Sequence, residues 1–366
     1  MATVYKTFLN NDIKSTRTLL HEAIPLTGAL VSGTYGTWPN GNNIKNYSHG
    51  MFQSVYDYPY LSSSANHIFD LAVGYSNNSI LSSSTNTQNA KKINMYNQMA
   101  AVLMGYDSSG SVVSFDRDGD LSQASSADKL NEAVFINFSR LLQKDEIKKG
   151  SFSLQLGGAP DFALANGERL TITDSPALTS YKVNGAAGEY GILTCSAGGA
   201  FIQPGNSMAK AGLIFYQAGV VVLSSSVFQG TQGGWSIAGP LLADANMIQA
   251  TSASLTGAMT GSSVQTTCDA IRHRIYNIEF NNTTELNSTI HFCRVNNSDF
   301  NYSSNPSYLN SGSIVVKNSQ MDAPVTYPTS VGLYSADNEL LAVAKLSEPL
   351  KKDPTNEMII RVRLDY

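Results

Sequence analysis

Apolar and polar residues alternate along several segments of this 366-residue chain, and this alternation most limits how it can fold. Tyr276, Ile278 and Phe280 alternate with polar residues, and residues 358–364 repeat the pattern with arginines on one face. Successive side chains of a β-strand point to opposite faces of a sheet, so each segment predicts a strand with one dry face. We therefore expect a mainly β fold of the α+β class, with antiparallel, sandwich-like domains and few helices.

Further strand signals lie in the middle of the chain. Residues 134–138 and 151–156 are short β-rich runs, and the charged stretch 144–150 between them fits a surface connection. Residues 213–216 and 220–223 are almost wholly apolar, which predicts two strands covered on both faces.

The segment 331–346 predicts a β-hairpin. Its two arms, Val331–Tyr334 and Leu340–Leu346, are strand-like, and residues 335–339 between them include the Asp and Asn that favour a turn. Residues 313–317 predict one more short strand.

One segment, residues 88–104, has the period of an amphipathic helix. Its apolar residues from Ile93 to Leu103 recur at intervals of three and four, which predicts one buried stripe. The Ser, Thr and Asn residues at 82–87 offer an N-cap, and Gly105 offers the left-handed position after the last turn.

Changes of period suggest three regions. We expect a mixed N-terminal region at 1–110, a β-rich middle domain at 111–265 and a C-terminal β domain at 266–366. Residues 229–263 are rich in Gly, Ala, Ser and Thr, with a short helix expected near 241–249. Because this segment has few large apolar side chains, it cannot build a core alone, and we expect a surface excursion or an assembly contact.

The chain carries few charges. Charged residues make up 14% of it, against roughly 25% in typical soluble domains. A surface with so little charge offers little repulsion between neighbours, so we interpret the chain as a subunit that is covered in an assembly. Ordinary β proteins rich in Asn and Ser share this composition, and that alternative stays open.

Several partners are not expected. The net charge is −4, and the lysine pairs at 91–92, 148–149 and 351–352 are isolated, so we expect solvated turns or strand ends there and no nucleic-acid binding. Residues 1–20 lack the apolar stretch of a secretion signal, and no segment has the length of a membrane span. We therefore expect folding in a cytoplasm, where the three cysteines stay reduced as small buried thiols.

Aromatic residues gather where we expect core or interface area. The candidate interface residues are Phe52, Tyr56, Tyr58, Tyr60 and Trp235.

Motifs for catalysis or cofactor binding are weak. Residues 116–120 resemble the start of a calcium loop, but Leu121 and Ala127 stand where that loop needs Gly and Glu, so a solvated turn is expected. His291 and Cys293 share a strand face without enough further ligands for zinc. There is no nucleophile elbow or phosphate loop. Carboxylate pairs for glycan cleavage stay open, because their separation depends on the fold. We therefore predict no catalytic residue, no cofactor and no metal.

Four segments resemble a known family. They are residues 20–28 (LHEAIPLTG), 48–60 (SHGMFQSVYDYPY), 140–152 (RLLQKDEIKKGSF) and 331–346 (VGLYSADNELLAVAKL). Together they look like virion structural proteins of marine and cyanobacterial contractile-tailed, T-even-like bacteriophages. The resemblance implies no enzyme activity and no cofactor. It implies a baseplate or tail subunit in the virion, assembled in the host cytoplasm, with other virion proteins and further copies of itself as partners.

Two other classes compete with this expectation. The Tyr, Trp and Asn content also suits a fibre or receptor-binding protein that recognises host surface glycans, although no fibre-like repeat or heptad period is present. The other class is a phage lytic enzyme, which would release cell-wall material.

Overall fold

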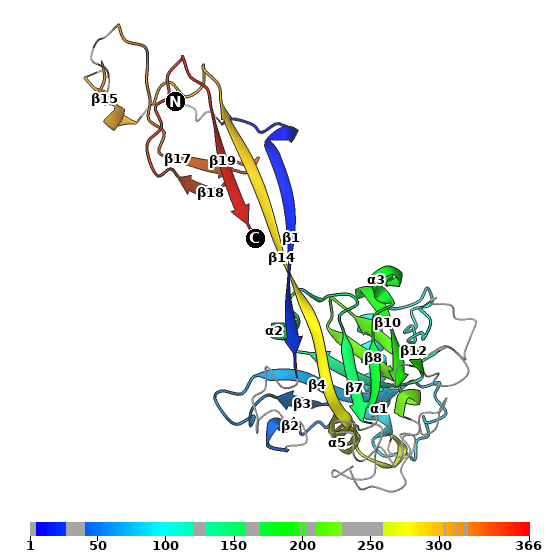
Figure 1. Cartoon of the computed structure of the whole chain (residues 1–366). Coiled ribbons are helices and arrows are strands. Elements are labelled where there is room, and N and C mark those ends of the chain that lie inside the picture. The colour runs from blue at the N-terminus through cyan, green and yellow to red at the C-terminus, as the bar shows by residue number, and fades with distance from the viewer. Residues whose placement is uncertain are drawn as a thin grey trace. The chain divides into compact units, whose positions relative to one another are not determined.

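The computed structural model describes most of the chain (Figure 1). The described residues are 5–26, 41–119, 129–157, 169–197, 200–201, 210–228, 259–303, 305–311, 313–315, 317, 319 and 321–366. They divide into two compact units. Unit 1 comprises Met1–Leu19 and Glu285–Tyr366, and unit 2 comprises Leu20–Thr284. The boundaries expected at residues 110 and 265 both fall inside unit 2.

Two long strands, β1 (Ile13–Pro25) and β14 (Ile275–Val295), have residues in both units. The other strands of unit 2 are β2 (Ile44–Asn46), β3 (Gln53–Tyr56), β4 (His67–Tyr75), β5 (Glu132–Phe138), β6 (Glu146–Ile147), β7 (Ser153–Gly157), β8 (Arg169–Thr173), β9 (Lys182–Asn184), β10 (Gly188–Ala197), β11 (Ala200–Phe201), β12 (Lys210–Phe215) and β13 (Val220–Ser224). Its helices are α1 (Asn89–Leu103), α2 (Arg140–Gln143), α3 (Ala177–Ser180) and α5 (Val264–Arg274), with 3-10 turns at Gly41–Asn43 and Ser225–Phe228.

The strands of unit 2 form a curved antiparallel sheet. Their order is β1-β14-β7-β8-β10-β12-β13-β5-β4-β3-β2. Five strands separate β14 from β5 in this order, yet the rings of Phe280 and Phe138 lie 4.9 Å apart. The sheet therefore curls so that distant strands face each other across one core, as the layers of a sandwich do. The expected β-rich α+β fold is confirmed.

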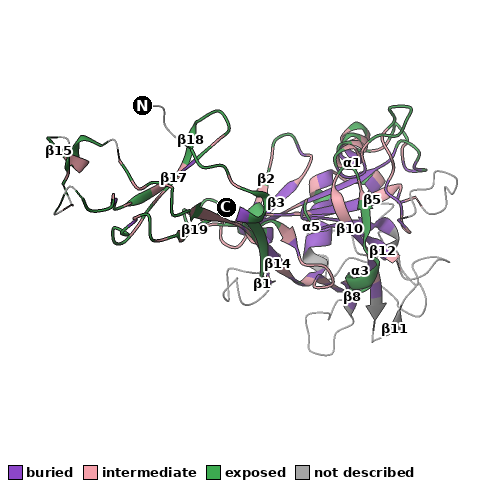
Figure 2. Cartoon of the chain, turned by 90° about the horizontal axis from the view of Figure 1, so that it is seen from above, coloured by how far each residue is buried: buried purple, intermediate pink, exposed green. Residues whose placement is uncertain are grey.

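Strand β4 shows how the core of unit 2 is divided. Leu71 and Val73 belong to one cluster of buried residues, and Ala72 between them belongs to the other. Helix α5 contributes Cys268 to the first cluster, and α1 contributes Tyr96 to the second. Because alternate side chains of a strand point to opposite faces, β4 lies between these two helices. Figure 2 shows the buried residues gathered on the strands of this unit.

The amphipathic helix expected at 88–104 is confirmed as α1. Gly105 follows it in the left-handed region with φ of +82°, also as expected. The N-cap prediction was wrong, because Gln88 precedes the helix, with φ of 54° and no side-chain cap. Its Oε1 instead accepts the backbone N–H of Val264, 2.9 Å away, at the start of α5. The Gln88 side chain thus binds the first turn of α5 and does not cap α1.

The two strands expected to be covered on both faces are β12 and β13. They pair from Gly212↔Leu223 to Phe215↔Val220, and every residue of β13 is buried. Gly219 makes the turn between them with φ of +66°, and a Cβ there would lie 1.4 Å from Oε1 of Gln143. Both the backbone angle and the close approach therefore require glycine.

The expectation that residues 144–150 form a surface connection was wrong in part. Within the stretch 144–150, Glu146–Ile147 forms β6 against β14, and Ile147 is fully buried. Apolar contact with the sheet outweighs the charges around this residue. The short helix expected near 241–249 lies outside the described residues.

Two lysines expected in solvated pairs, Lys92 and Lys352, are fully buried. The ammonium of Lys92 donates to the backbone oxygens of Thr87 (2.8 Å), Met259 (2.5 Å) and Ser262 (2.7 Å). Lys352 donates to three oxygens of unit 1. Each buried charge is thus compensated by three acceptors, as a buried ammonium requires.

Unit 1 is built from few strands. Besides β1 and β14 it contains β15 (Leu309–Asn310), β16 (Ser313–Ile314), β17 (Ser330–Tyr334), β18 (Leu340–Lys345) and β19 (Met358–Asp365), with 3-10 turns at Asn10–Asp12 and Pro306–Tyr308. Strand β19 pairs with β14 from Ser288↔Asp365 to Val295↔Met358. Strands β17 and β18 pair with each other, which confirms the expected hairpin. The expected closing strand is confirmed as β19.

Candidate interaction surface

The structure divides the expected aromatic interface into smaller contacts. Phe52 packs on Tyr47 and His49, with ring centroids 4.9 Å apart in both pairs. The rings of Tyr56 and Tyr60 form a separate pair, with their centroids 6.4 Å apart.

The exposure of these residues also varies. Phe52, Tyr56 and Tyr58 are half-buried, and Tyr60 is exposed. Trp235 lies outside the described residues. The four described aromatic residues therefore serve partly as packing near strands β2 and β3 at this end of the sheet, and their role as an interface stays a prediction.

A polar network lies beside these rings. The Ser54 hydroxyl is 2.5 Å from Oδ1 of Asp70, and Nε2 of His67 is 2.8 Å from the same oxygen. The hydroxyl of Tyr47 is 3.2 Å from Ser54. Burial raises the pKa of Tyr56, and its neighbours Tyr47 and Asp70 raise it further. Both Ser54 and His67 contact the carboxylate, so the imidazole is not placed as the base of the serine.

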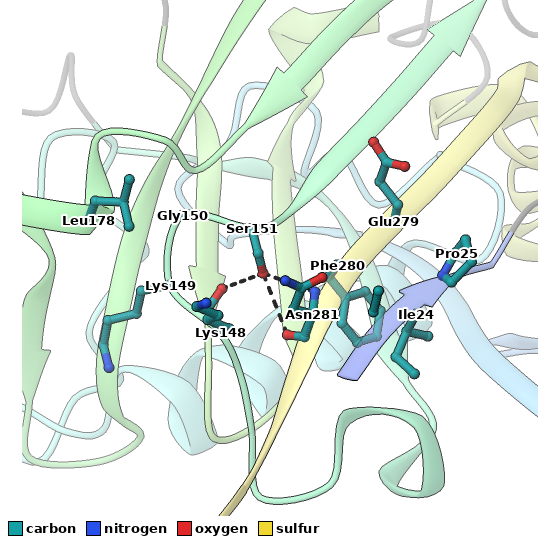
Figure 3. A pocket seen from close by; sticks show the side chains of 11 residues that line it. Ile24, Pro25, Lys148, Lys149, Gly150, Ser151, Leu178, Glu279, Phe280 and Asn281 are labelled. Atoms are coloured by element: carbon teal, nitrogen blue, oxygen red, sulfur yellow. Dashed lines mark hydrogen bonds between the residues drawn. The ribbon is translucent and has the colours of Figure 1, made fainter. Parts of the chain in front are cut away.

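A surface pocket of about 470 Å³ opens elsewhere on unit 2 (Figure 3). The loop 148–151 forms one wall, and β14 holds this loop. The N–H of Lys148 donates to the carbonyl of Asn281 at 2.7 Å, and the N–H of Asn281 donates to Oγ of Ser151 at 3.0 Å. The remaining lining residues are Ala23, Ile24, Pro25, Lys149, Gly150, Leu178, Glu279 and Phe280.

Two charged groups at the pocket, Lys149 in its lining and Asp174 behind the loop, have partners in the protein. Lys149 forms an ion pair with Glu189, and its ammonium lies 5.0 Å from the ring centroid of Tyr181. Behind the loop, the buried carboxylate of Asp174 accepts the N–H groups of Gly150 and Phe152 at 2.7 and 2.9 Å. These contacts fix the shape of the loop. The loop that forms this wall is therefore explained by its structural role, which is to connect β6 to β7.

Several apolar strand residues of unit 1 are strongly exposed. Leu341, Val343 and Ile359 are 68%, 57% and 62% exposed. Every residue of β1 that belongs to unit 1 is exposed too. Among the described residues of this unit, only Val325, Leu333 and Val362 are buried hydrophobics, and none belongs to either core cluster. Figure 2 shows exposed residues along β17 and β18.

The sequence predicted this hairpin but not its exposure. The run Leu340–Leu346 is nearly continuous in apolar residues, and a run of that kind is usual for a strand covered on both faces. In the structure, Leu341 and Val343 on one face of β18 are largely exposed. A run of this kind reads the same whether the strand is covered or exposed, so the sequence carried no signal for this surface.

The described residues were examined for metal-binding groups and for reactive cysteines. They contain no group of three or more His, Cys, Asp or Glu residues placed to hold a metal ion. Asp116, expected in a solvated turn, is buried and forms an ion pair with Lys129 at 2.5 Å. The cysteines are free thiols, and burial raises the pKa of Cys195 to about 11. A thiol with that pKa is protonated and weakly nucleophilic at neutral pH.

Comparisons with known proteins identified no similar protein. No protein-family model matches the chain, and searches of curated proteins and of solved structures found no match. Within the described part of the chain, no helix is long and apolar enough to cross a membrane.

Proposed function

We propose that this protein is a structural subunit of a tailed-phage virion, associated with the baseplate or tail, and that it acts through protein–protein assembly. The observation that carries the proposal is the uncovered apolar surface of unit 1. A domain of about 100 residues that folds alone buries roughly 60–70% of the surface of its unfolded chain. The three buried hydrophobic side chains described in unit 1 fall short of such a core.

The cost of this exposure is large enough to favour a partner. Full burial of a Val, Leu or Ile side chain contributes about 1.5–3 kcal/mol. Leu341, Val343 and Ile359 each expose more than half of their surface. Covering these three residues would contribute about 3–6 kcal/mol on that scale. A neighbouring subunit supplies that cover in an assembled particle.

The resemblance to virion proteins supports the same function. One of the four resembling segments, residues 331–346, is the β17–β18 hairpin together with its turn. Low charge also suits a surface that contacts neighbours. We place the protein in the virion, with other virion proteins and copies of itself as partners.

Mass spectrometry of purified virions, combined with cryo-electron microscopy of the particles, tests this function. We expect the protein in washed particles and its density at the baseplate or tail, with the hairpin against a neighbouring subunit. Absence from mature particles would refute the proposal. Density on the capsid or neck would remove the tail assignment alone.

A second candidate is glycan recognition by a fibre or receptor-binding protein. It is favoured by the exposed ring of Tyr60 and the carboxylate of Asp70, because sugars stack on aromatic faces and bond to carboxylates. The ring of Tyr56 links the two, since it lies 6.4 Å from the ring of Tyr60 and 5.5 Å from that of His67, which contacts Asp70. An oligosaccharide array with the purified protein tests it. Reproducible binding that Tyr60→Ala removes would favour this candidate, and a turbidity assay on host cells, where we expect no lysis, addresses the lytic class.

A further inference from the structure

One ion pair of unit 2 is buried on both sides. Oδ2 of Asp116 lies 2.5 Å from Nζ of Lys129, and the two side chains are 2% and 8% exposed. In every other ion pair among the described residues, at least one side chain is more than a tenth exposed. Burial disfavours both charged forms, so the neutral amine and the neutral carboxylic acid become more accessible here than in water.

The backbone holds these two residues opposite each other. Asp116 and Lys129 form an antiparallel β-bridge. Beside it, the N–H of Leu130 donates to the carbonyl of Phe115 at 3.0 Å. The hydroxyl of Tyr96 donates to the carbonyl of Leu130 at 2.7 Å and accepts the N–H of Phe115 at 3.3 Å. All three flanking residues are buried in one core cluster. The amine and the carboxyl are thus held together as the two groups of an intramolecular reaction are.

The Asp116 carboxyl has partners on both of its oxygens. Oδ1 accepts the backbone N–H groups of Asp118 and Gly119 at 3.0 and 3.1 Å. Two backbone N–H groups on one oxygen are the arrangement that stabilises the oxyanion formed in acyl transfer. Burial raises the pKa of Asp116, and a hydrogen bond with the Asp118 side chain raises it further, against the opposing effect of Lys129. A second carboxyl is therefore in place to carry a proton to or from Asp116.

We propose that Lys129 and Asp116 are joined by an intramolecular amide bond between Nζ and Cγ, formed with the Asp118 carboxylate as proton carrier. The ammonium first gives a proton to Oδ2, which leaves a neutral amine and a carboxylic acid. The lone pair of Nζ then attacks Cγ, and the electron pair of the C=O bond moves onto Oδ1, where the two backbone N–H groups stabilise the charge.

The second half of the reaction releases water. The Asp118 carboxylate takes a proton from the nitrogen and gives it to the Oδ2 hydroxyl. The C=O bond at Oδ1 re-forms, the bond from Cγ to Oδ2 breaks, and Oδ2 leaves as water. The ion pair becomes a neutral amide and one water molecule, without an oxidant or a cofactor. Burial favours this outcome, because the amide has no charge to keep in a low-dielectric interior.

The bond would act as a covalent staple within unit 2. It closes the chain between residues 116 and 129 into a ring, which restricts the unfolded chain as a disulfide does. The three cysteines are free thiols, so they supply no such constraint. This inference goes beyond the virion function and does not depend on it.

Mass spectrometry of the purified full-length protein distinguishes the bond from an unreacted ion pair. The bond lowers the intact mass by one water molecule. Trypsin cleaves after Lys and Arg, so an unreacted chain gives the separate peptides 118–129 and 130–140. The bond blocks cleavage after Lys129 and links residues 93–117 to residues 118–140 in one branched product. We expect the lower mass in the folded protein and the branched product in its digest.

Variants assign the atoms. Lys129→Arg keeps a positive charge beside the carboxyl but has no primary amine, and we expect it to restore the full mass, as should Asp116→Ala. Asp118→Asn should form the bond about a hundredfold more slowly, measured as the linked fraction over time after cell-free synthesis. The matched control is Lys149→Arg, which changes the ion pair with Glu189 and should keep the lower mass. Circular dichroism verifies folding of each variant.

The proposal is overturned by a folded, unmodified protein that has the full mass of its sequence and yields peptides 118–129 and 130–140 separately. A lower mass that persists in Lys129→Arg would place the lost water elsewhere and overturn it as well. Bond formation in Asp118→Asn at the unmodified rate would overturn the assignment of Asp118 as proton carrier.

Discussion

Replacement of Lys92 by methionine removes a buried ammonium while keeping most of the side-chain volume. In the folded protein this ammonium donates to the carbonyls of Thr87, Met259 and Ser262. Hydrogen bonds to a charged group contribute about 1.5–3 kcal/mol each. Burial opposes them, because it lowers the pKa of Lys92 from 10.5 to about 8. That change corresponds to about 3 kcal/mol.

The balance predicts a net loss of about 2–5 kcal/mol in the free energy of unfolding at pH 7. Urea titration monitored by circular dichroism measures it. The matched control is Lys91→Met, a half-exposed neighbour on α1, for which we expect a change within about 0.5 kcal/mol. A Lys92→Met variant as stable as the unmodified protein would refute the reasoning that the three carbonyls depend on this donor.

The pH dependence gives a second test with a defined sign. Between about pH 8 and 10.5 the unfolded chain keeps the Lys92 proton and the folded chain releases it. Stability rises with pH wherever the unfolded state binds more protons. The unmodified protein should therefore gain stability relative to Lys92→Met across this interval, and both should respond alike below pH 7. A constant difference from pH 7 to 10 would contradict the assignment.

Three other variants test the packing. Gly219→Ala should cost more than about 2 kcal/mol, because its φ is positive and the new Cβ would meet Gln143, whereas Gly261→Ala has open space and should change little. Asp174→Asn keeps one acceptor oxygen for three buried donors and should cost about 1–3 kcal/mol in the same urea assay. Lys352→Met should lower the stability of unit 1 selectively, which hydrogen exchange would detect as faster exchange in β19 than in β4.

Regular local patterns predicted much of the fold. A fixed period of apolar residues along the sequence was enough to predict three elements. They are the helix at 88–104, the hairpin at 331–346 and the closing strand. Lys92 and Lys352 could not be predicted as buried, since the oxygens that compensate them come largely from distant residues or irregular backbone. The same limit applies to Gln88, whose side chain binds a backbone N–H of α5, far along the chain.

The candidate surface was less predictable than the fold. Phe52 and Tyr56 were identified by aromatic density, a signal that does not separate rings packed on a strand edge from rings that meet a partner. Leu341 and Val343 belong to the exposed surface on which the proposed function rests, but their sequence is that of an ordinary covered strand. Exposure depends on what lies above a strand, and no local period records it.

Unit 1 combines the first residues of the chain with residues 285–366. During synthesis the early segment must therefore wait until the ribosome has produced the late one, whereas unit 2 can fold beforehand. A polypeptide that stops before residue 285 would lack the β17–β18 hairpin and strand β19, so its residues 1–19 would have no unit 1 to join. The order of translation would thus leave such a fragment with a folded unit 2 and an unpaired early segment, a form that limited proteolysis could distinguish.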